Sequence, residues 1–310
     1  MKWFIRFSSI GRLVSASAGL CALFFSACAP RPGFPTGEAS ACRIMTFNIR
    51  MNTPRDGENA WPFRKEMAAG TIDFFGADAA GLQEVLVSQL RDLEALLPEY
   101  GWVGVGRDDG REAGEYCPIF FLKERFRLLE SGTFWLSEDP ETAGLKGWDA
   151  ACARVVTRAR LEDRESGAVL AVYNTHFDHV GETARRESAR LLLRTIAAAP
   201  PGDAVVVTGD FNCTSEAIPY LILTGQSKER QFLRDARSVS LRPPYGSTFS
   251  FNGFEAGRTE GPLIDHIFVG PGVTVLRSGV LSDRWDGRVV SDHFPVVAEI
   301  RLPAPKGEGR

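Results

Sequence analysis

Short apolar segments, each ending in polar side chains, recur along this sequence and limit the folds open to it. Such segments are typical of strands whose sheet is covered on both faces. The clearest are residues 43–49, 78–83, 169–175 and 204–209. Amphipathic helices are predicted at residues 62–75, 87–97 and 182–199. This alternation indicates an α/β protein with helices packed on its sheets.

Further β-rich segments fill the rest of the chain. Residues 101–105, 117–122, 126–136 and 152–162 follow one another with the spacing expected of adjacent antiparallel strands. The last predicted strands are residues 263–269, 273–280 and 295–300. The sequence has no short-period repeat, which argues against a solenoid. We therefore expect one domain over residues 42–303, followed by a disordered tail at 304–310.

The first residues have the pattern of an export signal. Lys2, Arg6 and Arg12 precede an apolar run of small residues at 13–27 that contains no acid. That run is too short to span a bilayer comfortably as a helix. Phe25-Ser26-Ala27-Cys28 resembles a bacterial lipobox, although Phe25 stands where leucine is usual.

We therefore expect a lipoprotein signal peptide at residues 1–27 and a lipid-anchored Cys28 in the bacterial cell envelope. Residues 28–41, rich in proline and glycine, would be a tether between the membrane and the domain. A membrane-retained N-terminal helix and plain secretion are the alternatives.

The charge balance argues against strong binding of long nucleic acid. Without residues 1–27, which hold three basic and no acidic residues, 33 basic and 39 acidic residues remain, a net charge of −6. Non-specific binding of nucleic acid needs a basic surface. The protein is expected to be a monomer that acts on a short or small substrate.

The remaining cysteines, at positions 42, 117, 152 and 213, contain no C-x-x-C pair, so a zinc ribbon is not indicated. In an oxidising compartment Cys117 and Cys152 are the best candidates for a disulfide, because both begin predicted strands. Free buried thiols are the alternative.

Polar side chains that follow or precede the apolar strands are the candidates for chemistry. Strand ends gather at one edge of a layered α/β protein, where ligands bind. The residues concerned are Asn48, Glu84, Asn174, His176, Asp210, Asn212, Asp292 and His293. One such residue would be a helix cap or a turn residue, but a set from five strands favours a functional site.

The histidines narrow the set. All four lie within two residues of an aspartate: His176 and His179 around Asp178, His266 after Asp265, and His293 after Asp292. His176 and His293 are predicted to be functional. His179 is left open, and His266 is expected to be structural because its side chain alternates with that of Asp265 along a strand.

Six short motifs in this order resemble those of the endonuclease/exonuclease/phosphatase superfamily, from residue 43 to 301. They are Thr46-Phe47-Asn48-Ile49-Arg50, Gly81-Leu82-Gln83-Glu84, Asn174-Thr175-His176, Gly209-Asp210-Phe211-Asn212, Ile264-Asp265-His266-Ile267 and Ser291-Asp292-His293-Phe294-Pro295. The resemblance implies a four-layered α/β sandwich, in which two mixed sheets pack face to face with helices outside. It also implies a metal-dependent phosphoesterase.

The resemblance implies a role for each matched residue. Glu84, Asn48 and Asp292 would hold the metal, and their oxygen ligands favour Mg²⁺ or Mn²⁺ over zinc. The expected catalytic residues from these motifs are His176, Asp210, Asn212, Asp265 and His293, with Asp265 orienting His293. We further infer from the position of Glu115, before the 117–122 strand, that it is catalytic and orients His176, with a surface acid as the alternative. The expected substrate contacts are Asn174, Asp178 and Tyr116. Such residues would neutralise phosphate charge, activate water and assist the leaving oxygen.

Two other readings compete with a phosphoesterase. A metal enzyme of another class would use His176, Asp178 and His293 as iron ligands, or a His-x-Asp-His zinc motif. Both versions leave Glu84 and Asp210 without a task. A non-catalytic surface binding module on the same fold is disfavoured because no expected catalytic position is substituted. The substrate class stays open between a small organophosphate, a lipid headgroup and an oligonucleotide, and between a monoester and a diester.

Overall fold

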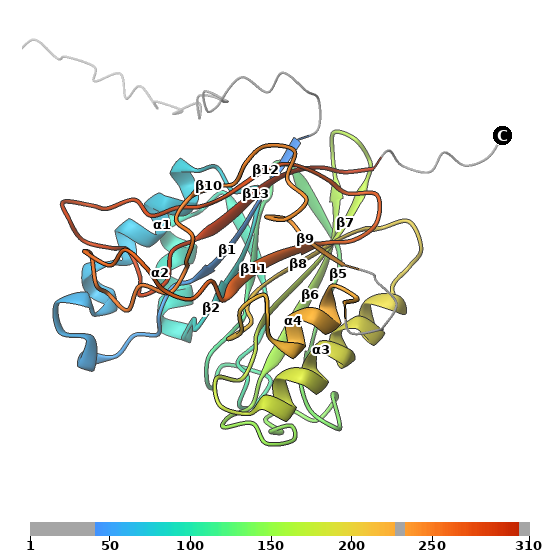
Figure 1. Ribbon diagram of the computed structural model, residues 1–310, viewed down its shortest axis with the longest axis horizontal. Coiled ribbons are helices and arrows are strands. Elements are labelled where there is room, and N and C mark those ends of the chain that lie inside the picture. The colour runs from blue at the N-terminus through green and yellow to red at the C-terminus, as the bar shows by residue number, and fades with distance from the viewer. Residues whose placement is uncertain (1–40, 227–232, 304–310) are drawn as a thin grey trace, which may run out of the picture. The chain divides into compact units, whose positions relative to one another are not determined.

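Two mixed β-sheets lie face to face in the structure, a computed structural model that describes residues 41–226 and 233–303 (Figure 1). The first sheet has the order β10-β12-β13-β1-β2-β4-β3, and the second has the order β5-β6-β7-β8-β11-β9. The strands of the first sheet are β1 (Ala41–Asn48), β2 (Ala79–Gln83), β3 (Tyr100–Val103), β4 (Ile119–Leu122), β10 (Tyr245–Gly246), β12 (Thr274–Val280) and β13 (Val296–Arg301). The strands of the second sheet are β5 (Phe126–Trp135), β6 (Val155–Asp163), β7 (Val169–His176), β8 (Ala204–Asp210), β9 (Arg234–Asp235) and β11 (Asp265–Val269).

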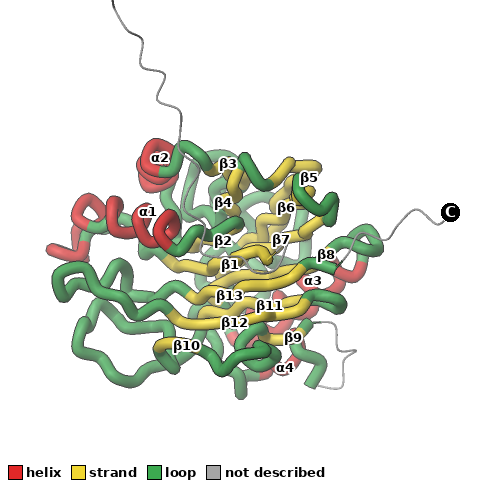
Figure 2. The backbone as a smooth tube through the Cα atoms, turned by 90° about the horizontal axis from the view of Figure 1, so that it is seen from above, coloured by secondary structure: helices red, strands yellow, loops and turns green. Residues whose placement is uncertain are grey.

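Helices cover the outer face of each sheet. Apolar clusters place α1 (Lys65–Phe74) and α2 (Val87–Leu96) on the first sheet, and α3 (Glu182–Ala197) and α4 (Ile218–Leu223) on the second. Figure 2 shows the two helix pairs on opposite sides of the strands. The short 3-10 helices η1 (Pro54–Asn59) and η2 (Trp61–Phe63) connect β1 to α1. The predicted four-layered α/β sandwich is confirmed.

Strand β1 shows why the predicted strands are apolar on both faces. Ile44 lies in the core between the two sheets, whereas Met45 and Phe47 pack with α1 and α2. All three side chains are almost wholly buried. Because successive side chains of a strand point to opposite faces, a strand covered on both sides has no position for an exposed polar residue before its end.

The prediction of one antiparallel run over residues 101–162 is wrong at its centre. β3 pairs with β4, and β5 pairs with β6, but β4 and β5 belong to different sheets. The chain crosses between the sheets at Arg125, whose guanidinium forms ion pairs with Asp78 at 2.9 Å and Asp163 at 3.2 Å. Arg125 also donates to the carbonyl of Ala41 at the start of β1. The spacing alone did not distinguish this crossover from a hairpin.

The predicted signal peptide 1–27 and tail 304–310 lie outside the described residues, as does nearly all of the tether 28–41. Ala41, predicted to end the tether, is the first residue of β1. No helix among residues 41–226 and 233–303 is long and apolar enough to cross a membrane. Cys42, Cys117, Cys152 and Cys213 are free thiols, so the Cys117–Cys152 disulfide prediction is wrong and its alternative holds.

Candidate active site

Strand pairing brings the predicted site residues to one edge of each sheet. β1 and β2 are parallel and place Asn48 opposite Gln83, which Glu84 follows. β7 and β8 are parallel and place His176 opposite Asp210. β11 runs antiparallel to β8, and its first residue, Asp265, also pairs with Asp210. The parallel pairs β1–β2 and β7–β8 therefore end where the antiparallel strand β11 begins, and these strand ends carry the site residues.

Two hydrogen bonds join the site across the sheets. The Nδ2 atom of Asn48, at the end of β1, donates to Asp210 Oδ2 in the second sheet at 3.0 Å. It also donates to Glu84 Oε1 at 3.0 Å. His293, just before β13, contacts Asp265 of the second sheet, with 2.8 Å between Nδ1 and Oδ2. Glu84 and His293 therefore belong to one connected site.

Asp210 lies at the centre of this site. Its Oδ2 atom is 3.4 Å from His176 Nε2 and 3.7 Å from His293 Nε2, and Oδ1 accepts from the backbone N–H of Asn212 at 2.9 Å. Burial, followed by the neighbouring Asp265 carboxylate, raises the pKa of Asp210 to about 7. A carboxyl group with such a pKa can take up and release a proton near neutral pH.

The pKa values of His293 and His176 are shifted in opposite directions. Although burial disfavours the charged imidazole, Asp265 and Asp210 raise the pKa of His293 well above its usual value. Burial, then the Arg154 charge, lowers the pKa of His176 well below the usual value. Two imidazoles with different proton affinity therefore flank one carboxylate.

Glu84 and Asp292 form a second acidic pair beside Asp210. The Arg50 guanidinium lies 3.7 Å from Glu84 and 3.8 Å from Asp292, and it forms a closer pair with Asp56 at 3.0 Å. Glu84 and Arg50 both have positive φ, 60° and 57°, which is strained for residues other than glycine. The Glu84 and Asp292 carboxylates thus share the Arg50 cation, so positive charge is favoured between them.

The donor chemistry of this pair fits a hard divalent cation. Glu84 and Asp292 offer carboxylate oxygens, which are ligands that Mg²⁺ and Mn²⁺ prefer, whereas the amide oxygen of Asn48 accepts from the backbone N–H of Arg50 at 3.0 Å and its Nδ2 faces Glu84. Asp210, Asp265 and His293 form another group whose potential ligand atoms lie within 4.8 Å of one another. In that group, however, Asp265 already accepts or shares the proton on His293 Nδ1.

His176 is held mainly by Asn212. Asn212 Nδ2 contacts His176 Nε2 at 3.0 Å and donates to the carbonyl of Phe177 at 3.0 Å. Glu115, predicted to orient His176, approaches its Nδ1 atom to 4.0 Å, beyond hydrogen-bond distance. The Glu115 carboxylate instead accepts from Arg107 at 2.7 Å, so Arg107 is a partner that the sequence did not indicate.

The side chain of Asn174, predicted to contact substrate, lies between the two sheets. Its side chain is fully buried between the sheets, where Nδ2 donates to the carbonyls of Leu82 and Pro118 at 2.7 and 2.9 Å. Its Oδ1 accepts from Gln83 at 2.7 Å and from Thr208 at 3.1 Å. Because every donor and acceptor site on the amide is engaged, Asn174 joins the sheets and has nothing left for a ligand.

Asp178, also predicted to contact substrate, is engaged by backbone N–H groups and by Arg154. Its Oδ1 accepts from the backbone N–H groups of Ala151, Val180 and Gly181 at 3.1, 3.0 and 2.8 Å. Arg154 Nε donates to the other oxygen at 3.4 Å. The carboxylate thus ties the 151–154 segment to the start of α3, and it is 1% exposed.

The hydroxyl of Tyr116 donates to the carbonyl of Arg111 at 2.9 Å, and the ring is buried against α2, so the predicted substrate contact does not fit. His266 is buried in the core, as expected. Its Nε2 atom lies 3.1 Å from the Cys213 carbonyl oxygen, and its Nδ1 atom lies 3.4 Å from Asp235 Oδ2. His179 is exposed, and its Nδ1 contacts Arg154 at 3.0 Å.

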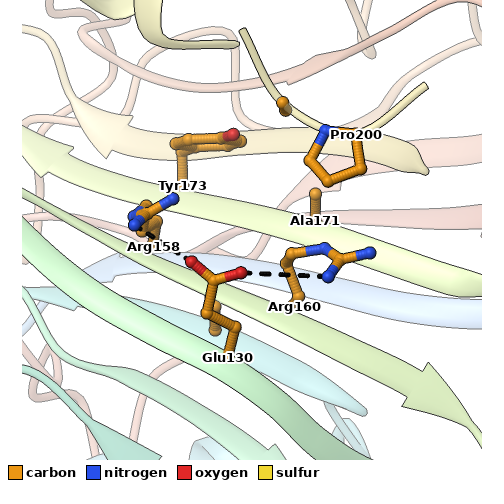
Figure 3. A pocket seen from close by; sticks show the side chains of 8 residues that line it. Glu130, Arg158, Arg160, Ala171, Tyr173 and Pro200 are labelled. Atoms are coloured by element: carbon orange, nitrogen blue, oxygen red, sulfur yellow. Dashed lines mark ion pairs between the residues drawn. The ribbon is translucent and has the colours of Figure 1, made fainter.

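A pocket on the outer face of the second sheet is separate from this site (Figure 3). None of the predicted site residues lines it. The guanidinium groups of Arg158 and Arg160 lie 3.0 and 3.8 Å from the Glu130 carboxylate. Arg160 also forms an ion pair with the carboxylate of Asp203 at 2.7 Å. The pocket therefore offers no uncompensated positive charge for an anion.

Comparison with known proteins identifies the family. Residues 45–293 match the Endonuclease/Exonuclease/phosphatase family, so the chain belongs to it. A solved endonuclease/exonuclease/phosphatase from Bacteroides vulgatus is 40% identical, with a TM-score of 0.80, over 85% of this chain and 99% of that one. A mannosyl-6-phosphatase from Bacteroides thetaiotaomicron is 32% identical, with a TM-score of 0.79, over 84% of this chain and 100% of that one.

A more distant relative is longer. An uncharacterized protein of Acanthamoeba polyphaga mimivirus is 24% identical over 268 residues, which cover 74% of this chain and 38% of the viral protein. The chain thus spans less than half the length of this curated relative. Members of the family are hydrolases that act on phosphoester bonds.

Proposed function

We propose that this protein is a Mg²⁺- or Mn²⁺-dependent phosphatase that hydrolyses a small phosphate monoester, with a phosphorylated sugar as the substrate class. The observation that carries the proposal is the pair of links across the sheets, Asn48 to Asp210 and Asp265 to His293. They bring an oxygen-rich acidic pair and two imidazoles into one site, as phosphoester hydrolysis requires.

Glu84 and Asp292 would hold the cation, and Asn48 would join them once its amide is turned so that Oδ1 rather than Nδ2 faces Glu84. When bound, it would neutralise charge on the non-bridging oxygens of the phosphate. The oxygen-only donor set and the attraction of the Arg50 cation to both carboxylates support this assignment. The iron and zinc alternatives are less well supported. Asp178 lies with Cys152 and His179 in a group whose potential ligand atoms are within 4.8 Å of one another, but one of its oxygens accepts from three backbone N–H groups and the other from Arg154.

The proton-transfer steps fall to the buried residues of the second sheet and to His293. Asp210 would orient the attacking water and accept its proton as the new P–O bond forms. Asn212, whose Nδ2 contacts His176 and Phe177, would hold His176 in place, and His176 would stabilise the negative charge that develops on the phosphoryl group. His293, held by Asp265 and with its pKa raised, would give its Nε2 proton to the leaving sugar oxygen as the ester P–O bond breaks.

The substrate assignment draws support from similarity and charge. A protein 32% identical over 84% of this chain is described as a mannosyl-6-phosphatase. The net charge of −6 after removal of residues 1–27 disfavours a long nucleic acid. We also propose that the protein is a monomer, exported to the bacterial cell envelope and lipid-anchored through Cys28.

A metal-supplemented substrate screen tests the function. The purified protein is assayed with sugar phosphates, inositol phosphates, phospholipids, oligonucleotides and bis-p-nitrophenyl phosphate, with and without EDTA. We expect phosphate release from a sugar phosphate that EDTA abolishes, that Mg²⁺ or Mn²⁺ restores, and that Glu84→Gln lowers roughly 10²–10³-fold. Folded protein with no turnover above the Glu84→Gln background would exclude a phosphatase. Faster cleavage of a diester than of any monoester would exclude the proposed substrate class.

A further inference from the structure

Arg64 is a fully buried arginine that lies beneath the candidate metal site and contacts none of the predicted catalytic side chains. It is the residue before α1, and its exposed fraction is 0%. Its guanidinium donates to four backbone carbonyls: Asn59 at 2.5 Å, Ile49 at 2.8 Å, Val290 at 2.9 Å and Arg50 at 3.4 Å. A buried cation is retained only where such partners replace its water.

Three of these carbonyls belong to the two chain segments that carry the proposed metal ligands, and the fourth, that of Asn59, ends η1. Ile49 and Arg50 directly follow Asn48 at the end of β1, and Val290 stands two residues before Asp292. A single nitrogen, Nη1, donates to both Ile49 and Val290, which are 241 positions apart in the chain. The guanidinium therefore fixes the spacing between the two segments.

The charge of Arg64 also matters to the acidic pair. No carboxylate within residues 41–226 and 233–303 forms an ion pair with it. Burial lowers its pKa to about 10, against the opposing effect of Asp292 and then Asp56. The guanidinium also lies over the rings of Trp61 and Phe254, at 5.6 and 5.2 Å. Arg64 therefore stays charged at neutral pH, close enough to Asp292 to be attracted by it.

We propose that Arg64 is a positioning residue of the metal site, which holds the Asn48 and Asp292 segments at the spacing that the cation requires. This inference rests on the proposed function. Arg64 would contribute to the metal affinity although it is not itself a metal ligand. Residues that orient metal ligands typically contribute 10–100-fold to affinity in this way.

The test measures Mn²⁺ binding directly, by electron paramagnetic resonance and by calorimetry, without substrate. The variants are Arg64→Met and Arg64→Lys, with Glu84→Gln as the variant that lacks a proposed ligand. Arg125→Met is the matched control, because Arg125 is also a mostly buried arginine but donates to Ala41 at the opposite end of β1. Circular dichroism and cooperative urea unfolding establish that each variant is folded.

We expect Arg64→Met to bind Mn²⁺ roughly 10–100-fold more weakly than the wild type and with an altered resonance spectrum. Arg64→Lys should be intermediate, because an ammonium group keeps the charge but cannot reach all four carbonyls at once. Arg125→Met should lose stability and keep the wild-type affinity.

Wild-type affinity in a folded Arg64→Met protein would overturn the inference. If that variant does not fold, wild-type affinity and spectrum in Arg64→Lys would overturn it equally. A wild-type protein whose Mn²⁺ binding is absent, or is unchanged in Glu84→Gln, would instead refute the metal site itself. These outcomes separate failure of the positioning role from failure of the proposed function.

Discussion

Replacing Asp178 should weaken the fold and leave substrate binding intact. In Asp178→Ala, the backbone N–H groups of Ala151, Val180 and Gly181 lose their common acceptor, and Arg154 loses its carboxylate. An unpartnered buried donor costs about 1–3 kcal/mol, and a buried charge left unpaired about 3–5 kcal/mol. Because water can reach the 151–154 segment once it loosens, we expect a total loss of about 3–5 kcal/mol in unfolding free energy.

Asp178→Asn separates the hydrogen bonds from the charge. The amide oxygen can still accept from the backbone, so the expected loss is about 1–2 kcal/mol at pH 7. The three backbone N–H groups and then Arg154 hold the pKa of Asp178 well below its usual value, although burial opposes them. The stabilisation from the charge is therefore complete above the unfolded pKa, about 3.9, and is lost as pH falls through the folded value.

The assay is urea unfolding of both variants at pH 7 and at several lower values, with KM measured for the proposed substrate. The stability difference between wild type and Asp178→Asn should shrink as pH falls below about 4. Glu130→Gln is the control, since its half-exposed ion pair with Arg158 should contribute less than about 1 kcal/mol. A stable Asp178→Ala protein with a greatly raised KM would refute this reasoning and restore the substrate contact.

Three other substitutions test the site and the sheet interface. Asp265→Asn removes the carboxylate that holds His293, so kcat should fall roughly 10²–10⁴-fold while KM changes less. An unchanged kcat would show that the contact between Asp265 and His293 does not matter for catalysis. Asn174→Ala takes a donor from the buried Leu82 and Pro118 carbonyls, although Pro118 keeps the Leu82 N–H, and it removes the acceptor of Gln83 and Thr208. The unfolding free energy should therefore fall by about 2–4 kcal/mol, whereas a raised KM alone would favour a ligand contact. Gly81→Ala would press a methyl group against Thr208 and Asn174, costing about 1–3 kcal/mol or more in a thermal melt, and a neutral result would mean that the sheets separate easily there.

The sequence predicted the layers and the main strands because burial on both faces leaves a strong apolar signal. β1 and β8 show this clearly, since their apolar runs end at the residues that enter the site. It did not predict the crossover at Arg125, because the partners of Arg125 there, Asp78 and Asp163, are distant in sequence and come near it only in the folded protein. The short strands β9 and β10 and the helix α4 were missed because segments of that length carry too little periodic pattern.

The sequence predicted which chain positions lie at the site better than it predicted what each side chain does there. The strand-end pattern correctly placed Asp210 and His293 together, because pairing of strand ends fixes the backbone. It placed Asn174 in the site for the same reason, yet the side chain points between the sheets. Arg64 and Arg107 gave no comparable signal, since they act through carbonyls and a carboxylate that only folding brings near.

The division of the site between the sheets bears on how activity arises during folding. Asn48 and His293 lie on segments of the first sheet, whereas Asp210 and Asp265 lie on strands of the second sheet. Neither half of the protein can therefore generate a working centre before the other docks against it. Recovery of catalysis after dilution from denaturant would report this final docking, and should lag behind the return of secondary structure measured in the far ultraviolet.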